Sequence, residues 1–293
     1  MIFPSLLYEA INKYLQNEFS EDCNIVNTNK LSGGSINEAV KVTTSCGEFF
    51  LKYNIADKYP SMFDKEFKGI EILANTNAVT VPKVLVSGIS EPYSYLLMEY
   101  EQPARQTNDY WEVFAKQLAA LHGNQSDLFG LDHDNYIGSL FQSNKTSNDL
   151  VYFLVNERFE PLIRIAKDNR QLSTSDIHYF ERIFNKLEYL IPKEKPTLIH
   201  GDLWSGNIIV NKQGRPVLID PAIYYGHREM DIAMTRLFGG FPEKFYSVYN
   251  DYYPLIKGWE QRIEINQLYP LLVHVILFGE SYVSQVRNII KKY

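Results

Sequence analysis

The sequence contains few cysteines and no long apolar segment. Cys23 and Cys46 are the only two cysteines among 293 residues, too few and too far apart for a metal knuckle or a disulfide framework. Such a composition favours a reducing cytoplasm. No segment is long and apolar enough to cross a bilayer, and residues 1–19 lack the basic flank and small-residue cleavage site of a signal peptide. We therefore expect neither a membrane protein nor a secreted one.

Charge of one sign is not concentrated anywhere along the chain. The formal net charge is -6 and no block of like charges occurs, so neither nucleic acid nor a membrane surface is an expected partner. Repeats and low-complexity tracts are also lacking. With 45% apolar and 22% charged residues the composition is that of a globular protein, and the length predicts one large domain or two linked ones.

The spacing of apolar residues changes about one third of the way along the chain. After a first helical segment, the expected order is three strands, a helix and two strands, at 25–31, 39–44, 49–53, 62–74, 80–86 and 95–100. The rest is mainly helical, at 109–121, 150–166, 176–190, 230–238 and 267–286, with short strands at 197–199, 208–210 and 217–219. The pattern predicts an α+β fold with a β-rich lobe at residues 1–100 and a larger helical lobe at 101–293.

The strongest chemical signal is the segment HGDLWSGN at residues 200–207. It presents Asp202 and Asn207 after an apolar strand, and the strand at 217–219 is followed by Asp220. Carboxylates at the ends of apolar strands are costly unless their charges find partners, and a divalent cation is such a partner. Because Mg²⁺ takes oxygen ligands, Asn207 and Asp220 are candidate metal ligands, and Asp202 is free to accept the proton of an attacking hydroxyl. The alternative makes Asp202 a turn cap and Asp220 a loop acid, which does not explain the ordered set.

Lys52 and Glu66 form a second candidate group. Strand alternation places Lys52 on an apolar face, and helical spacing does the same for Glu66. Each charge would be expensive there alone, whereas pairing them solves both problems and lets the lysine hold nucleotide phosphates. In the alternative, Lys52 extends its stem to water and Glu66 lies at a helix edge.

Two further segments are candidate contacts for ATP. They are the loop of Gly33, Gly34 and Ser35, and the inter-lobe segment of Glu99, Tyr100, Glu101 and Gln102. Glycine lets backbone N–H groups approach phosphate closely, although no Gly-Lys-Ser/Thr follows and a plain hairpin turn is the alternative. Backbone groups of the inter-lobe segment would contact an adenine edge, or else the segment is only a linker.

His200 and Trp204 lie within the same loop as Asp202. No second histidine has ligand spacing to His200, so we expect a hydrogen-bonded structural histidine that holds the loop. Trp204 is either core packing or a surface that stacks on substrate, and the sequence leaves both alternatives open.

These motifs together resemble those of the fructosamine kinase (ketosamine 3-kinase) family, which has the two-lobed fold of protein kinases and aminoglycoside phosphotransferases. The resemblance is carried by LSGGSINEA at 31–39, FFLK at 49–52, HGDLWSGN at 200–207, DPA at 220–222, YGHRE at 225–229 and FGGFP at 238–242. His-Gly-Asp followed by Asn is shared with aminoglycoside and choline kinases. The Leu-Trp-Ser-Gly filling and the stretch 225–242 are specific to fructosamine kinases. The resemblance covers nearly the whole chain.

The resemblance implies phosphoryl transfer from ATP to the 3-hydroxyl of a ketoamine, a sugar attached to an amine. The product decomposes and frees the amine. By position, Asp202 resembles the catalytic base, Asn207 and Asp220 the Mg²⁺ ligands, and Lys52 with Glu66 the phosphate-positioning pair. Fructosamine, ribulosamine and erythrulosamine adducts are the implied substrates, and acceptance of glycated protein stays open. Some family members carry a cysteine in the phosphate loop, linked to redox-sensitive dimers, and this loop has none.

Departures from protein kinases indicate a small substrate. The loop lacks the arginine that receives an activation-loop phosphate, and Asp-Pro-Ala replaces Asp-Phe-Gly. Between Asp220 and the helix near Met230 there is no room for a peptide-binding segment. Two alternatives are a kinase for another small alcohol, such as an aminoglycoside, choline or a thiosugar, and a nucleotide-binding pseudoenzyme. Loss of Lys52, Asp202 or Asp220 would favour the pseudoenzyme, and all three are present.

Overall fold

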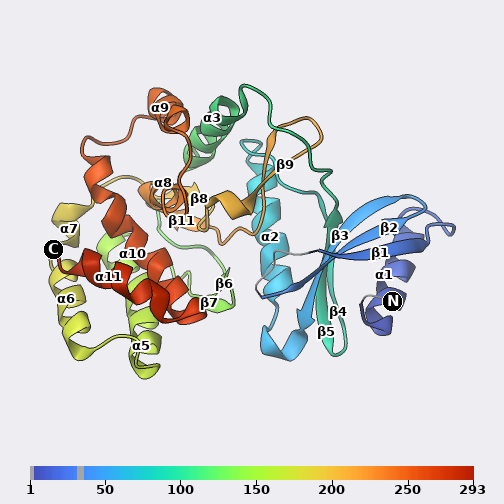
Figure 1. The fold of residues 1–293 in the computed structure, drawn as a ribbon, viewed down its shortest axis with the longest axis horizontal. Coiled ribbons are helices and arrows are strands. Elements are labelled where there is room, and N and C mark those ends of the chain that lie inside the picture. The colour runs from blue at the N-terminus through green and yellow to red at the C-terminus, as the bar shows by residue number, and fades with distance from the viewer. Residues whose placement is uncertain (1–2, 32–35) are drawn as a thin grey trace.

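The N-terminal part of the chain forms an antiparallel sheet with a helix on each face (Figure 1). A computed structural model describes residues 3–31 and 36–293. The sheet has five strands in the order β1-β2-β3-β5-β4, and the predicted hairpin of β2 and β3 is confirmed. The elements are α1 (Ser5–Glu18), β1 (Ile25–Leu31), β2 (Glu38–Thr44), β3 (Gly47–Ile55), α2 (Met62–Asn75), β4 (Val84–Ser90) and β5 (Tyr93–Glu99).

Alternation along β5 decides which helix packs on which face of the sheet. Leu97 belongs to the apolar cluster that contains Ile11 of α1. Its neighbour Leu96 points the other way and packs in the cluster of Ile70 from α2. As Figure 1 shows, α2 therefore lies between the sheet and the rest of the molecule, which carries Glu66 to the boundary of the two lobes.

The C-terminal part is mainly helical and packs around one large apolar core. Its helices are α3 (Tyr110–His122), α4 (Leu150–Phe153), α5 (Glu160–Asp168), α6 (Thr174–Phe184), α7 (Leu187–Leu190), α8 (Glu229–Thr235), α9 (Glu243–Tyr252), α10 (Trp259–Phe278) and α11 (Val283–Ile290). Three short strand pairs join them: β6 (Asn135–Ile137) with β7 (Leu140–Gln142), β8 (Thr197–Ile199) with β11 (Tyr224–Gly226), and β9 (Ile208–Val210) with β10 (Pro216–Leu218). None of the helices described is long and apolar enough to cross a membrane.

The helix predicted at 150–166 is interrupted by a π-helical segment, Leu154–Phe159, between α4 and α5. The wider turn accompanies the full burial of Arg158. Its guanidinium donates to the Asn144 side chain at 2.6 Å and lies 3.9 Å from the centroid of the Tyr224 ring. A π turn absorbs an extra residue within an otherwise regular helix, so apolar spacing does not reveal it.

Other element bounds also differ from the prediction. The helix expected at 267–286 ends before Gly279, whose φ of 86° is a backbone conformation that glycine adopts far more readily than other residues, and α11 follows. The helix expected at 176–190 divides into α6 and α7, and α9, β6, β7 and β11 were not predicted. Helix α9 packs on α3, where the rings of Phe245 and Phe114 lie 5.2 Å apart. A tertiary contact therefore stabilises this helix.

The strand predicted at 80–86 begins only at Val84. Pro82 has no N–H to donate to a ladder. The Thr80 carbonyl instead accepts the N–H of Leu218 at 2.9 Å, which joins this segment to β10 of the other lobe.

The two cysteines lie together, so the expectation drawn from their spacing is wrong. The register of β1 and β2 pairs Ile25 with Thr44. This brings the Cα atoms of Cys23 and Cys46 to 5.5 Å, and the two sulfurs form a disulfide. A hairpin register sets the distance, and separation along the chain does not. Cysteine spacing therefore no longer supports a reducing compartment.

Candidate active site

The segment after β8 forms a tight loop that presents Asp202. Asn207 Nδ2 donates to the backbone oxygen and to Oδ2 of Asp202, both at 2.8 Å. His200 is fully buried, with Nε2 donating to the Ile219 carbonyl at 3.0 Å and Nδ1 accepting from the Asp202 N–H at 3.3 Å. The expected structural histidine is confirmed. Ile219 in turn donates its N–H to the Asn207 carbonyl, which brings the end of β10 and Asp220 against the loop.

Asp231 of α8 holds this loop, and the sequence analysis did not identify it. Its carboxylate accepts the N–H groups of His200 at 2.7 Å and Gly201 at 2.9 Å, and lies 3.3 Å from His122 Nε2. Gly201 has a φ of 83°, and a Cβ at this position would collide with the Ala222 carbonyl. In the sequence, Asp231 is an acidic residue within an apolar helical segment, and this pattern does not indicate which groups its carboxylate binds.

The environment of Asp202 suits proton transfer. Burial raises the pKa of Asp202 to about 7, opposed by the hydrogen bond from Asn207 and supported by the charges of Asp220 and Asp231. A general base works best when its pKa lies near the working pH. This carboxylate can therefore accept a proton from a hydroxyl group that enters the site.

Lys52, Glu66 and Asp220 form a charged cluster between the lobes. Lys52 Nζ donates to Glu66 Oε1 at 2.7 Å and also to Asp220 Oδ1. Burial lowers the pKa of Lys52, but the two carboxylates outweigh this effect and the net pKa is raised, so the lysine stays charged. The pairing of Lys52 with Glu66, inferred from a strand face and a helix face, is present in the structure.

Asp220 has an uncommon backbone conformation. Its φ of 55° lies in the left-handed region, which costs energy in any residue other than glycine and is concentrated at functional sites. Within residues 3–31 and 36–293, Asn207 Oδ1 and Asp220 Oδ2 accept no hydrogen bond. Carboxylate and amide oxygens are ligands that Mg²⁺ prefers, so the chemistry of Asn207 and Asp220 fits the predicted metal.

A cavity of about 680 Å³ lies between the lobes. It is lined by most of the predicted residues: Lys52, Glu66, Glu99, Tyr100, Glu101, Asp202, Trp204, Asn207 and Asp220. The side chain of Gln102 donates to Glu48 instead and does not line the cavity. Gly33, Gly34 and Ser35 lie outside the described residues.

Trp204 is part of the cavity wall. Its side chain is half-buried, and its indole stands edge-on to the ring of Phe238 with the centroids 5.6 Å apart. The ring packs against Phe238, and Trp204 lines the same cavity as Asp202. This position fits a surface for substrate better than a core residue, and a substrate contact stays a prediction.

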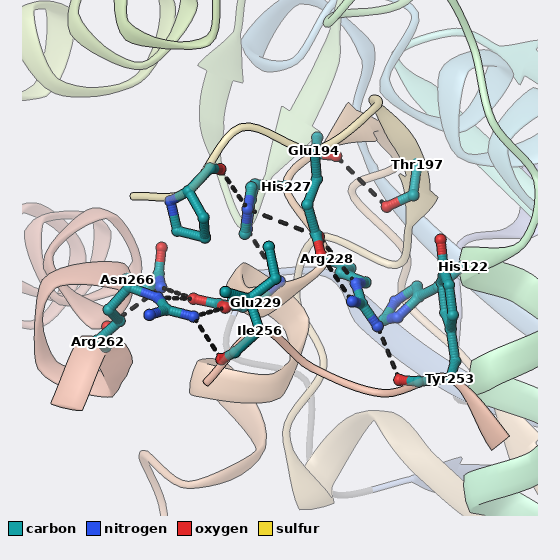
Figure 2. Close-up of polar contacts among 12 residues, drawn as sticks. His122, Glu194, Thr197, His227, Arg228, Glu229, Tyr253, Ile256, Arg262 and Asn266 are labelled. Atoms are coloured by element: carbon teal, nitrogen blue, oxygen red, sulfur yellow. Dashed lines mark hydrogen bonds and ion pairs between the residues drawn. The ribbon is translucent and has the colours of Figure 1, made fainter. Parts of the chain in front are cut away.

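Buried ion pairs hold the beginning of α8, as Figure 2 shows. Arg228 donates to the two carboxylate oxygens of Glu194 at 2.8 Å and 2.6 Å. Glu229 accepts from Arg262 Nε at 2.8 Å, and Figure 2 shows the two groups facing each other. Residues 225–229 were part of the family resemblance, but the sequence analysis assigned them no role. The structure shows that it anchors the helix that carries Asp231.

The chain is similar in sequence to proteins described as ketoamine kinases. A probable ketoamine kinase of Enterococcus faecium is 39% identical over 266 residues, which cover 89% of this chain and 93% of that protein. The chloroplastic protein-ribulosamine 3-kinase of Arabidopsis thaliana is 34% identical over 277 residues, which cover 92% of this chain and 83% of that protein.

Solved structures and a family model lead to the same family. The crystal structure of a candidate fructosamine-3-kinase from Haemophilus somnus matches with a TM-score of 0.88 and 31% identity over 98% of this chain and 99% of that one. A thermostable mutant of aminoglycoside phosphotransferase APH(4)-Ia matches with a TM-score of 0.63 over 96% of this chain and 98% of that one, and at 15% identity it shows the fold alone. The predicted α+β, two-lobed, protein-kinase-like fold is confirmed. A family model described as fructosamine kinase matches residues 7–293, and the chain therefore belongs to the fructosamine kinase family.

Proposed function

We propose that this protein transfers the γ-phosphoryl group of ATP to the 3-hydroxyl of a ketoamine. The observation that supports this most directly is one cavity that combines a half-buried carboxylate, Asp202, with a charged lysine, Lys52. The chain belongs to a kinase family, and its relatives are named for ketoamines and ribulosamines. Phosphoryl transfer relies mainly on positioning and on compensation of charge, and these groups supply both.

The proposed reaction assigns a role to each group. Asp202 accepts the proton of the 3-hydroxyl while its oxygen attacks the γ-phosphorus, and the bond from that phosphorus to the bridging oxygen breaks so that ADP leaves. Lys52, held by Glu66, positions the phosphates. Asn207 and Asp220 would hold Mg²⁺, which would supply positive charge for the phosphate oxygens.

The short connection after Asp220 supports a small acceptor. Strand β11 begins at Tyr224 and α8 begins at Glu229, which leaves no room for a platform that binds a peptide. We propose free ketoamines as acceptors, and glycated proteins where the adduct protrudes from the protein surface. Residues 1–100 would bind the nucleotide, and residues 101–293 the acceptor. We propose that the reaction takes place in the cytoplasm, where ATP is available, without a nucleic-acid or membrane partner.

An acceptor screen tests the proposed function. Purified protein with ATP and Mg²⁺ is incubated with fructosamine, ribulosamine and erythrulosamine derivatives of a blocked lysine, and ADP release and phosphorylated product are measured. Removal of Mg²⁺ by a chelator is expected to stop turnover. Turnover of an aminoglycoside or choline but of no ketoamine would contradict the proposal. Nucleotide binding without turnover of any acceptor would favour the pseudoenzyme.

Lys52 and Glu66 are expected to be energetically coupled. Lys52→Met should weaken productive use of ATP because it removes the cation that holds the phosphates. Glu66→Gln should do the same more mildly, since the lysine keeps Asp220 as a partner. In a double-mutant cycle on kcat/KM for ATP, we expect a coupling of about 0.5–3 kcal/mol for groups in contact. Strict additivity would show that their 2.7 Å contact does not matter for catalysis.

A further inference from the structure

His274 of α10 has no role in the proposed reaction, yet it lies in the wall of the same cavity as Asp202 and Trp204. It precedes Leu277 and Phe278 by about one helical turn, and both of these also line the cavity. One face of α10 is therefore turned toward the part of the cavity next to Trp204. Since Lys52 and the inter-lobe segment belong to the nucleotide side, this face belongs to the acceptor side.

A hydrogen bond determines the tautomer of His274. Its Nδ1 lies 2.8 Å from the Pro270 carbonyl oxygen, which can only accept, so Nδ1 carries the proton. Burial lowers the pKa of His274, opposed by this bond, and the ring is neutral near pH 7. Nε2 then presents a lone pair. In the part of the chain that the structure describes, nothing donates to it. A half-buried acceptor of this kind is suited to an N–H or O–H group of a ligand.

Aromatic rings surround the imidazole. The centroids of the Phe238, Tyr282 and Phe278 rings lie 4.7, 5.1 and 5.3 Å from that of His274. Trp204 stands edge-on to Phe238 and extends the same aromatic group along the wall. The negative faces of aromatic rings attract cations. A hydrogen-bond acceptor among such faces favours a cationic N–H donor over a neutral hydroxyl.

We propose that His274 binds the protonated amine of the ketoamine, with Nε2 accepting its N–H and with Trp204 and Phe278 as aromatic surfaces beside it. This inference rests on the proposed function. In a ketoamine only the carbonyl carbon and one methylene separate the nitrogen from the carbon that bears the 3-hydroxyl, so both ends of this unit fit the 680 Å³ cavity next to Asp202. A free ketose has a neutral hydroxyl in place of the amine. His274 therefore selects sugar–amine adducts and leaves free sugars untouched.

His274→Phe tests the proposal, because it keeps an aromatic ring and removes the acceptor. We expect the KM for a fructosyl-amine to rise about 10- to 100-fold, the usual effect of losing a hydrogen bond to a charged group, with kcat and the KM for ATP unchanged. An N-acetylated ketoamine, whose nitrogen is uncharged and has no N–H, is the comparison substrate. Its kcat/KM should be the same in the variant and the wild type. His274→Gln, whose side-chain oxygen can accept, should recover part of the affinity.

His178→Phe is the matched control, since this histidine lies on α6 with a side chain 70% exposed, and wild-type kinetics are expected for it. An equal loss of kcat/KM for the ketoamine and its acetylated analogue in His274→Phe would overturn the proposal. If a thermal melt shows that the variant does not fold, the wild type decides: equal KM values for the two substrates would also overturn it, and a much higher KM for the analogue would support it. Failure of the wild type to phosphorylate any ketoamine would instead contradict the proposed function.

Discussion

Replacing Asp202 with asparagine is expected to remove most turnover and to leave nucleotide binding nearly unchanged. General-base assistance contributes about 10²–10⁴-fold, and an amide oxygen is too weak a base to replace a carboxylate whose pKa is about 7. The Asn207 N–H that donates to Asp202 Oδ2 at 2.8 Å would still find an oxygen, so the loop keeps its shape. Turnover at saturating ketoamine, together with titration of a non-hydrolysable ATP analogue, separates the two effects.

Asp132→Asn is a suitable control for this experiment. The Asp132 side chain is 88% exposed and does not line the cavity, so the variant should behave as the wild type does. Wild-type turnover in Asp202→Asn would show that the proton leaves by another route. Loss of analogue binding would assign Asp202 to the nucleotide site and not to the acceptor.

Arg228→Met is expected to lower the free energy of unfolding by about 3–5 kcal/mol, the usual loss when one partner of a buried ion pair is removed. Arg228 is 3% exposed and binds both carboxylate oxygens of Glu194. Its guanidinium also donates to the carbonyls of Tyr253 and Pro254 at 2.8 Å and 2.7 Å, and these acceptors would lose their donor. Urea unfolding followed by tryptophan fluorescence measures the change.

Two further variants show whether the ion pair is the cause. Arg228→Met combined with Glu194→Gln should cost less than the sum of the single changes, because the second removes the charge that the first leaves unpaired. Arg182→Met, on the exposed face of α6, should change stability by less than about 0.5 kcal/mol. A loss below about 1 kcal/mol for Arg228→Met, in the range of surface ion pairs, would contradict a buried network.

Much of the cavity could be predicted because its residues follow local rules. Asp202 and Asp220 each follow a short apolar strand, and a buried strand that ends in a carboxylate is visible in the sequence alone. Lys52 and Glu66 each interrupt an apolar face, and pairing them avoids two unpaired charges on apolar surfaces. The structure brings the four together at one cavity, although their catalytic roles remain proposals.

Residues that hold the cavity-lining segments in place through contacts outside the cavity could not be predicted. Asp231 and His122 are separated by 109 positions and meet behind the loop that carries Asp202. Arg228 and Glu194 come from two connecting segments, and nothing local relates them. His274 lies in a predicted apolar helix, and the sequence does not show that this face of α10 forms part of the cavity wall. Each depends on how separate elements pack, which periodicity along one element does not contain.

The sequence by itself determined the fold class, the order of the sheet elements and most of the residues predicted to line the cavity, because strand alternation, helical spacing and short polar loops are local properties of the chain. The tertiary structure decided the pairing of Cys23 with Cys46, the π turn at Arg158, the existence of α9 and the surroundings of His274. These features depend on register, on burial against distant elements and on the crossing of helices. They are set by contacts between segments far apart in the chain, whose energies appear only when the segments meet.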